Sequence, residues 1–387
     1  MFDIIATTFF GLENVLAEEI KNIGGQNVQP ITRAVIFKGD NEALYRANLW
    51  CRTALKILVP IQTFKAFNDK EFYDQARQIN WQRYMAVDDT FAIDSVASGP
   101  IFTHSKYLAL KCKDAIADYF RDKRGRRPNV DVEYPDLRVN VHAFNSEITI
   151  SIDSTGIPMS KRGYKTRQVQ APLNEVMAAG ILKLTDWDCQ TPLIDPMCGS
   201  ATFATEACMM AMDIAPGSYR NFAMEKWRDF DSKLWGNLRQ EAKDRRLPHP
   251  TATIAAYDRD PMALDVASQN IDKAGLSEYI DLDRRNFFDA LTDGKQSGKL
   301  LIMNPPYGER IDGGSGDDMT DFYRQIGDSL KQNYADSRAW ILSGNLDAIK
   351  RIGLHPSRKI KLYNGAIECR LECFELYDGS KKRAREK

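Results

Sequence analysis

Apolar and polar residues follow two different patterns along the chain, and the change between them falls near residue 155. Before that point, alternating runs typical of strands are mixed with segments of helical spacing. Four alternating runs predict strands, at residues 32–39, 90–98, 136–144 and 147–155. Asn145 and Ser146 supply turn-forming residues between the last two runs, so we expect a β-hairpin there. This half of the chain therefore has an α+β character.

Two segments of the first half have apolar residues at helical spacing. Residues 12–25 place apolar side chains on one face and stop at Gly24-Gly25, which suits a helix C-terminus. Residues 105–122 are apolar on one face, carry lysines on the other, and run into the basic sequence RDKRGRR. Cations near a helix C-terminus complement its dipole, and the same strip of charge suits phosphate groups.

The second half alternates short apolar strands with helices. Strands are predicted at 191–195, 251–258, 299–307 and 337–344, with the last apolar strands near 359–377. Helices are predicted at 171–184, 200–213, 262–275 and 321–334, and Pro172 stands in the first turn, which tolerates proline. This alternation predicts an α/β fold with a doubly wound, mostly parallel sheet that has helices on both faces.

Composition limits the class of protein. The chain has 387 residues, 43% of them hydrophobic, which allows two or three packed domains. No run reaches the roughly 18 apolar residues of a membrane helix, and the N-terminus lacks the basic region of a secretory signal. The 7 cysteines have no framework spacing, which favours a reducing cytoplasm. Cys369 and Cys373 are interpreted as buried strand residues and the histidines do not cluster, so we expect no metal.

Charge is unevenly distributed although it sums to zero, with 53 basic and 53 acidic residues. The balance argues mildly against a nucleic-acid partner, but phosphate binding is a local effect because salt screens charges within about 8 Å. Residues 106–127 carry eight Lys and Arg against three Asp, and residues 155–170 carry cations and no acid. Each patch alone is explained as a solvated surface, whereas their recurrence favours RNA. The expected RNA contacts are Lys106, Lys111, Lys113, Lys123, Arg124, Arg126, Arg127, Lys161, Arg162, Lys165 and Arg167.

A candidate cofactor site lies at the ends of two predicted strands, where ligands bind in open parallel sheets. Asp195 ends one strand, in LIDPMCGSATF, and its carboxylate can bind the ammonium or backbone groups of a cofactor. Gly199 lets the following turn approach the ligand closely. Asp258 ends another strand and can accept hydrogen bonds from both hydroxyls of a ribose, or alternatively cap the helix that begins at Pro261. G-x-G-x-x-G is absent, which disfavours a dinucleotide.

The sequence RNFFD supplies two further candidates. Asn286 stands where an amide could bind an adenine amino group, and Phe287 could lie against the ring. The alternative is a turn residue followed by a core phenylalanine.

The most specific motif is Asn304-Pro305-Pro306-Tyr307, which follows a predicted strand. An exocyclic base amine is a poor nucleophile because its lone pair is delocalised into the ring. Two acceptors that take hydrogen bonds from its N–H groups would localise that lone pair, and the Asn304 side-chain oxygen and the Pro305 carbonyl are suitable. Pro306 stiffens the turn, and Tyr307 offers a face for stacking an extruded base. The alternative, a structural Pro-Pro turn, does not explain the upstream carboxylates.

These motifs resemble a known family. DPMCGSATF is similar to the cofactor loop, and NPPYGER to the catalytic loop, of Rossmann-like methyltransferases of the N-P-P-Y amino-methylating type. The resemblance implies S-adenosyl-L-methionine as cofactor and adds Cys198 and Ser200 to the cofactor contacts. Ala201 stands where the family usually has a second glycine, and Asn286 where an acid is commoner.

The first half resembles a THUMP domain preceded by a ferredoxin-like segment, through residues 104–131, the hairpin 136–155 and the junction 160–175. We expect a ferredoxin-like segment at 1–55, THUMP at 56–155, a basic linker at 156–170, the methyltransferase domain at 171–380 and a basic tail at 381–387. The resemblance is strongest to bacterial 23S rRNA guanine-N2 methyltransferases, some of which carry a second methyltransferase domain; we expect one activity only, because this chain stops at Lys387.

The resemblance implies N2-methylation of a guanosine in 23S rRNA or its ribosomal precursor, by a cytoplasmic protein. Three alternatives stay open. They are guanosine methylation in tRNA, adenine-N6 methylation of DNA or glutamine methylation of a protein factor, and a non-catalytic RNA-binding module. The basic first half argues against DNA and protein substrates, and the intact Asn304 and Tyr307 argue against loss of catalysis.

Overall fold

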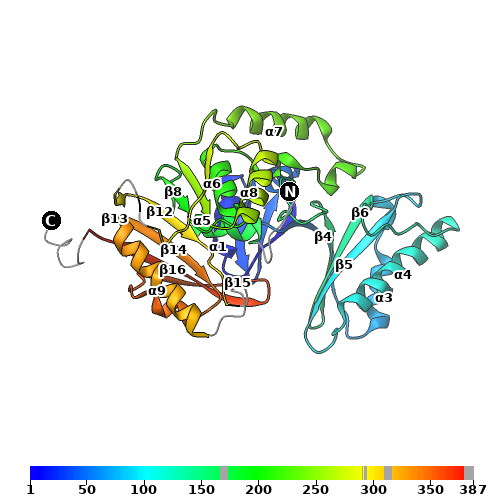
Figure 1. The fold of residues 1–387 in the computed structure, drawn as a ribbon. Coiled ribbons are helices and arrows are strands. Elements are labelled where there is room, and N and C mark those ends of the chain that lie inside the picture. The colour runs from blue at the N-terminus through cyan, green and yellow to red at the C-terminus, as the bar shows by residue number, and fades with distance from the viewer. Residues whose placement is uncertain (166–172, 290, 292–293, 309–315, 379–387) are drawn as a thin grey trace. The chain divides into compact units, whose positions relative to one another are not determined.

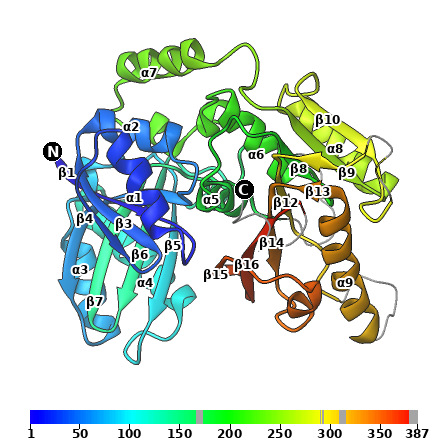
Figure 2. The ribbon, with the colours of Figure 1, turned by 90° about the vertical axis from the view of Figure 1, so that its left-hand side faces the viewer.

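The structure, a computed structural model, describes residues 1–165, 173–289, 291, 294–308 and 316–378. The chain forms two compact units, which are drawn in Figures 1 and 2. The first comprises Met1–Thr8, Leu16–Met159 and Arg220–Glu241, and the second comprises Phe9–Val15, Ser160–Tyr219 and Ala242–Lys387. Within the described residues, no helix has both the length and the apolar character needed to cross a membrane.

The first unit contains one seven-stranded sheet in the order β2-β3-β1-β4-β7-β6-β5. Only β5 and β6 run parallel among its paired strands. The expected hairpin is confirmed: β6 and β7 pair antiparallel around Asn145, whose φ of 54° suits the turn. The strands are β1 (Phe2–Thr7), β2 (Gln26–Ile31), β3 (Ala34–Gly39), β4 (Lys56–Lys65), β5 (Phe91–Ser98), β6 (Leu137–Phe144) and β7 (Glu147–Asp153).

Helices α3 (Asp69–Gln78) and α4 (Ser105–Arg124) of the first unit cover the β5–β6–β7 part of the sheet (Figure 1). The apolar face predicted for residues 105–122 is confirmed, because Leu108, Cys112 and Ile116 are buried in this core with Phe72. The helices are α1 (Glu13–Asn22), α2 (Asn41–Trp50), α3 (Asp69–Gln78), α4 (Ser105–Arg124) and α7 (Ser232–Arg245), with short turns η1 (Trp81–Arg83) and η3 (Ala223–Lys226); α1 and α7 each continue past a unit boundary in sequence.

The second unit is an α/β sheet in the order β10-β9-β8-β12-β14-β16-β15, as the doubly wound prediction requires. The first five strands in this order are parallel to one another. β16 pairs antiparallel with β14, and β15 pairs antiparallel with β16. The strands are β8 (Leu193–Asp195), β9 (Ile254–Asp258), β10 (Ile280–Arg284), β12 (Leu300–Met303), β14 (Ser337–Ser343), β15 (Arg358–Asn364) and β16 (Ile367–Leu376). A separate pair joins β11 (Gln296–Ser297) to β13 (Tyr334–Ala335).

Helices pack on both faces of this sheet, and the strands alternate between two cores. Ile302 faces the core that contains α5, α6 and α8, whereas Leu301 and Met303 face the core that contains α9, which Figure 2 shows in orange beside β14. The helices are α5 (Glu175–Leu184), α6 (Thr202–Ala211), α8 (Pro261–Lys273) and α9 (Gly316–Asn333), with short turns η2 (Pro216–Tyr219) and η4 (Ala348–Ile352).

The start of α5 differs from the sequence prediction. The helix begins at Glu175 rather than near residue 171, because the Asn174 side chain caps it by accepting hydrogen bonds from the Val176 and Met177 amides. Pro172 lies outside the described residues.

Close packing of α9 on η4 yields a stability prediction. A Cβ added to Gly327 would lie 1.8 Å from the Ile352 carbonyl oxygen. Gly327→Ala should therefore lower the free energy of unfolding by about 1–2 kcal/mol, because an overpacking cost of about 2–3 kcal/mol outweighs the helix-propensity gain of about 1 kcal/mol. Denaturant titration measures the change. Gly236→Ala on α7 is the matched control, because no atom lies within 4 Å of that added Cβ. Equal stability of Gly327→Ala and the wild type would contradict the close contact.

Candidate active site

The loop between β8 and α6 presents a buried carboxylate at a strand end. Asp195 is 1% exposed, and its Oδ1 atom has no hydrogen-bond partner among the described residues. An unpaired buried oxygen is costly unless a ligand donates to it. Gly199 follows with φ of 54°, in the left-handed region that favours glycine. The loop therefore fits a ligand that brings an ammonium or N–H group to Asp195.

The electrostatics of this loop also favour a cationic ligand group. Burial, reinforced by the nearby Asp258 carboxylate, raises the pKa of Asp195 well above its ordinary value. Burial, with the charges of Asp195 and Asp258 adding to it, also raises the pKa of the Cys198 thiol. A positive group beside Asp195 would stabilise its charged form.

Asp258 connects this loop to the neighbouring strand. Its Oδ2 accepts a hydrogen bond from the Gly199 amide at 2.9 Å, and its Oδ1 accepts one from the Asp260 amide at 3.0 Å. The alternative that Asp258 caps the following helix is wrong, because the cap is Asp260, whose side chain accepts from the Met262 amide at 2.9 Å. Asp258 is thus available at the strand end for the proposed ribose contact.

Contacts from two helices hold the rest of the loop. The Ser200 hydroxyl lies 3.2 Å from the Thr202 hydroxyl, and Asn270 of α8 donates to the Ser200 carbonyl at 3.3 Å. Ala201 is fully buried with φ of 58° and ψ of 34°, so this alanine adopts the left-handed conformation at the position where the resembling family has glycine. That conformation costs a non-glycine residue about 1–2 kcal/mol.

Asn286 and Phe287 occupy the turn and core positions that were the alternative interpretation. The Asn286 amide donates to Asp289 Oδ1 at 3.1 Å and its oxygen accepts from the Phe288 amide at 3.4 Å. Phe287 is 8% exposed, and its ring stacks on Tyr334. A role for either residue toward an adenine ring stays a prediction.

The N-P-P-Y loop comes to the same sheet edge as the two aspartates. Asn304 directly follows β12, which pairs parallel with β8, and β8 pairs parallel with β9. Because parallel strands end on the same side, Asn304, Asp195 and Asp258 lie at adjacent strand ends. The structure therefore brings together the cofactor and catalytic candidates that the sequence separates.

Inside this loop the Tyr307 hydroxyl donates a hydrogen bond to Asn304 Oδ1. Asn304 and Tyr307 are partly exposed, whereas Pro305 is buried. Burial raises the pKa of Tyr307, so its hydroxyl is a neutral donor. The acceptor that we expected to receive a base amine thus already accepts one hydrogen bond, and its second lone pair can accept another.

Two expected RNA contacts are wrong, because the residues are buried in the second unit. Arg162 is 1% exposed and pairs with Glu206, which is itself fully buried, with Nε to Oε1 at 3.1 Å. Although burial opposes it, Glu206 keeps the pKa of Arg162 above its ordinary value. Lys165 donates to the Thr202 hydroxyl at 3.1 Å and to the Leu173 carbonyl at 2.9 Å. Neither cation can reach a phosphate on the surface.

The sequence did not lead us to the carboxylates that pair with these buried cations. Glu206 lies inside α6, and Tyr164 also donates to it at 3.0 Å. Glu175, at the start of α5, is 3.7 Å from Lys165. The available signal was Glu206 itself, the single charge within the run SATFATEACMMAM. A lone carboxylate there requires a buried partner.

The remaining described basic candidates belong to the first unit, except Lys161, which belongs to the second. Lys106, Lys123, Arg124, Arg126, Arg127 and Lys161 are exposed, Lys111 and Lys113 partly so, and Arg167 lies outside the described residues. Arg126 pairs with Asp88 at 2.7 Å and Arg127 with Asp118 at 2.6 Å. These ion pairs reduce the charge that both arginines offer to phosphates. RNA binding by this surface stays a prediction.

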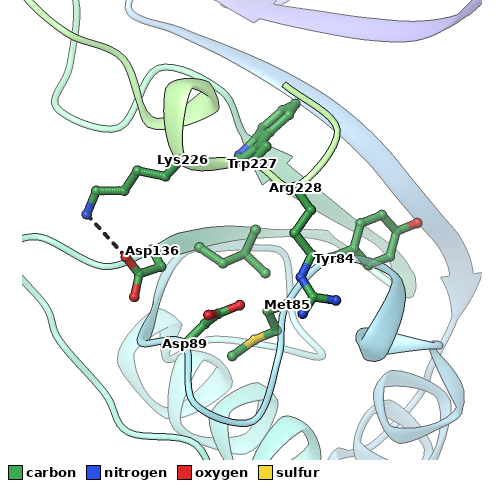
Figure 3. Close-up of a pocket in the computed structure, with 8 residues that line it drawn as sticks. Tyr84, Met85, Asp89, Asp136, Lys226, Trp227 and Arg228 are labelled. Carbon is green, nitrogen blue, oxygen red and sulfur yellow. Dashed lines mark hydrogen bonds and ion pairs between the residues drawn. The ribbon is translucent and has the colours of Figure 1, made fainter. Parts of the chain in front are cut away.

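A pocket within the first unit is separate from these candidates (Figure 3). Its charged side chains are occupied by the protein: Lys226 donates to the Tyr134 and Pro135 carbonyls and pairs with Asp136 at 3.5 Å. Asp136 also accepts from Thr90 at 2.8 Å. The pocket contains none of the residues that the motifs indicate, and we assign it no function. Its lining is Tyr84, Met85, Asp89, Asp136, Leu137, Lys226, Trp227 and Arg228.

Known proteins resemble the whole chain. A family model described as RMKL-like, methyltransferase domain matches residues 162–372, a THUMP domain model matches 66–153, and an RlmL ferredoxin-like domain model matches 3–58. A putative RNA methyltransferase of Synechocystis sp. is 38% identical over 96% of this chain and 96% of its own length. A ribosomal RNA large subunit methyltransferase K/L of Methylococcus capsulatus is 38% identical over 97% of this chain, which spans 51% of that relative.

A solved structure of a putative methyltransferase complexed with S-adenosylhomocysteine (SAH) has a TM-score of 0.84 and 29% identity, covering 97% of this chain and 98% of that one. Fold and comparisons together define a Rossmann-like methyltransferase whose cofactor is S-adenosylmethionine. The chain belongs to the RMKL-like methyltransferase family and carries a THUMP domain and a ferredoxin-like segment before the methyltransferase domain.

The raised pKa of Asp195 predicts how cofactor affinity depends on pH. The carboxyl takes up a proton above the ordinary aspartate value of about 3.9, and protonation removes the charge that would hold an ammonium group. SAH affinity should therefore fall as the pH is lowered through this raised pKa. Isothermal titration at several pH values measures the trend. Asp195→Asn should bind SAH more weakly and lose this dependence, whereas exposed Asp347→Asn should not. The same pH profile in Asp195→Asn and wild type would exclude Asp195 as the cause.

Proposed function

We propose that the protein transfers a methyl group from S-adenosylmethionine to the exocyclic N2 of a guanosine in 23S rRNA. The observation that carries the proposal is the shared strand edge, where Asn304 follows β12 beside Asp195 of β8 and Asp258 of β9. The bound cofactor would supply a methyl group on a sulfonium; the S–CH3 bond breaks as the N–CH3 bond forms, S-adenosylhomocysteine leaves as a neutral thioether, and the amine then loses one proton to solvent. The chain's own residues have to bind and orient the amine.

The roles of the loop residues follow from the chemistry of a delocalised amine. Asn304 Oδ1 and the Pro305 carbonyl would accept the two N–H hydrogen bonds and localise the nitrogen lone pair. Pro306 stiffens the loop, and the Tyr307 ring would stack on the extruded base. Orientation of the reacting atoms at about 3–3.5 Å supplies much of the rate gain. The hydrogen bond from the Tyr307 hydroxyl orients the Asn304 side chain and leaves its oxygen a second lone pair for the base amine.

Support for an RNA substrate comes from the first half of the chain and from the relatives. The THUMP match covers residues 66–153, the Synechocystis relative is named a putative RNA methyltransferase, and several relatives are named for ribosomal RNA of the large subunit. The chain spans about half the length of the latter. The rRNA substrate that their names print is therefore a proposal for this chain.

Guanosine in tRNA is the main competing substrate. The purified protein should be incubated with a labelled methyl donor and, separately, with 23S rRNA and tRNA from cells that lack its gene. Label in 23S rRNA is expected. Label in tRNA alone would reject the rRNA assignment, and label in neither, at confirmed SAH binding, would reject the proposed activity on mature RNA.

Removing the Asn304 side chain tests the catalytic assignment. Asn304→Ala should lower turnover by about 10²-fold or more, because a hydrogen bond that aligns the reacting amine is lost, while SAH affinity stays unchanged. Single-turnover kinetics and titration calorimetry measure the two quantities. Asn221→Ala, at an exposed position of the first unit, is the control and should behave as wild type. An unchanged rate in Asn304→Ala would remove this residue from the mechanism.

The basic strip at the end of α4 should contribute salt-dependent RNA affinity. Replacing Lys123, Arg124, Arg126 and Arg127 with Gln should weaken binding and flatten the dependence of log K on log salt by up to about 0.9 for each lost phosphate contact. Lys123→Gln with Arg124→Gln should account for most of this, because Arg126 and Arg127 are already paired with carboxylates. Filter binding over a salt series provides the slopes.

The matched control for this strip removes the same number of charges from the second unit, at Lys295, Lys331, Lys350 and Lys359, which are exposed and paired with acids. Constant affinity in the strip variant, or an equal loss in the control, would show that residues 123–127 are only a solvated surface.

A further inference from the structure

Ser343, the last residue of β14, and Tyr323 of α9 form a buried pair of hydroxyls that reaches the N-P-P-Y loop. The Ser343 and Tyr323 side chains are fully buried and their hydroxyl oxygens lie 2.6 Å apart. The Tyr323 hydroxyl also reaches the Pro306 carbonyl at 3.5 Å. A polar pair in the core between α9 and β14 is stable only when it is fully hydrogen-bonded, and one of its partners is the loop itself.

Asn345 forms a second connection to the same loop. Its amide donates to Ser343 Oγ at 3.0 Å, and its side-chain Nδ2 donates to the Tyr307 carbonyl at 3.2 Å. Its Oδ1 accepts from the Ala348 amide at 2.9 Å, which fixes the orientation of the carboxamide. The Pro306 carbonyl is thus held by Tyr323 of α9, and the Tyr307 carbonyl by Asn345, which follows β14.

Gly344, between these two residues, lies against the ring of Tyr307. A Cβ at this position would lie 2.8 and 3.0 Å from Tyr307 Cδ2 and Cε2, and 2.8 Å from Ile367 Cγ2. The backbone of Gly344 is not in the left-handed region. Glycine is therefore required here by the approach of the aromatic ring, and not by the conformation of its own backbone.

The far end of the same ring meets three side chains. The Tyr307 hydroxyl donates to Asn304 Oδ1, interacts with the Asn364 side chain, and lies 3.9 Å from Cys369 Sγ. Asn364 and Cys369 belong to β15 and β16. Gly344 thus bounds one side of the Tyr307 ring, and the hydroxyl at the tip of the ring is hydrogen-bonded to Asn304, the proposed amine acceptor. The distance between the ring and Gly344 therefore determines where Asn304 is held.

We propose that Gly344 and Asn345 are positioning residues for the amine-binding loop. Gly344 sets how deeply the Tyr307 ring sits, and Asn345, supported by Ser343 and Tyr323, fixes the backbone that carries Pro306 and Tyr307. This inference rests on the proposed methyl transfer to a base amine. Gly344 and Asn345, which follow β14, then affect turnover and base binding but not cofactor binding.

Gly344→Ala is the direct test. The added methyl group should displace the Tyr307 ring and lower kcat by about 10-fold to 10²-fold, since displacements on the order of 1 Å at a reacting centre have effects of this size. SAH affinity should be unchanged. Gly236→Ala is the matched control and should turn over as wild type, because its added Cβ meets no atom within 4 Å.

Asn345→Asp provides a second variant that keeps the fold. The carboxylate retains the acceptor for the Ala348 amide but loses the donor to the Tyr307 carbonyl. We expect a lower kcat, unchanged SAH affinity and a melting temperature that falls less than in Asn345→Ala. Asn345→Ala should add a loss of stability, because the Ala348 contact is then also lost.

The outcomes separate this inference from the function on which it rests. Wild-type turnover in both Gly344→Ala and Asn345→Asp would overturn the positioning role and leave the proposed function intact. A wild-type enzyme that binds SAH but methylates no RNA would overturn both. Equal losses of SAH affinity and turnover in the variants would show a general disturbance of the unit, and would also overturn the positioning role.

Discussion

The site depends on the parallel pairing of three neighbouring strands, β9, β8 and β12. Leu193 of β8 pairs with Ile254 on one side and with Leu300 on the other, so the three strands run together and end at one edge. Each strand contributes one polar residue just where its hydrogen-bonded ladder stops. The hydrogen bond from the Gly199 amide to Asp258 shows the consequence, because it joins a loop after β8 to the end of β9. A change in this pairing would separate Asp195, Asp258 and Asn304, because these residues are distant in sequence and only the sheet brings them together.

Both loops at this edge are supported by buried polar contacts. On the cofactor side, Lys165 donates to Thr202, whose hydroxyl lies beside that of Ser200. On the amine side, Asn345 and Tyr323 reach the backbone of the N-P-P-Y loop. Buried charges and amides are costly unless each is paired, and such contacts therefore favour a single arrangement of the loops. The junction 160–165 that seemed basic and exposed in sequence is part of this support.

The second half of the fold could be predicted because its strands are short, apolar and separated by helices. The positions of the cofactor and catalytic motifs could be predicted from these strands, since Asp195 and Asp258 end two of the apolar runs and Asn304 follows a third. The first half was harder. β4 contains Pro60 and has a register shift between Pro60 and Gln62, so its alternation is interrupted. The single sheet of the first unit also depends on pairing of β4 with both β1 and β7, which residue spacing does not reveal.

The environment of a site residue could not be predicted where its partner is distant in sequence. Arg162 looked like a surface cation because its neighbours are polar, yet its partner Glu206 lies 44 positions away on α6. The ring of Phe287 also stacks on a residue that is distant in sequence, Tyr334 of β13, and its contact with an adenine ring stays a prediction. In both cases the local pattern was correct and the tertiary contact decided the environment.

Methyl transfer to the exocyclic amine of a guanine, at the strand edge formed by Asn304, Asp195 and Asp258, can be measured on its product. RNA is treated with the wild-type protein and an isotopically labelled methyl donor, and its nucleosides are analysed by mass spectrometry. We expect labelled N2-methylguanosine, which Asn304→Ala forms about 10²-fold more slowly. Labelled N6-methyladenosine, a ring-methylated or ribose-methylated nucleoside, or an equal rate in Asn304→Ala would exclude the proposed methyl transfer.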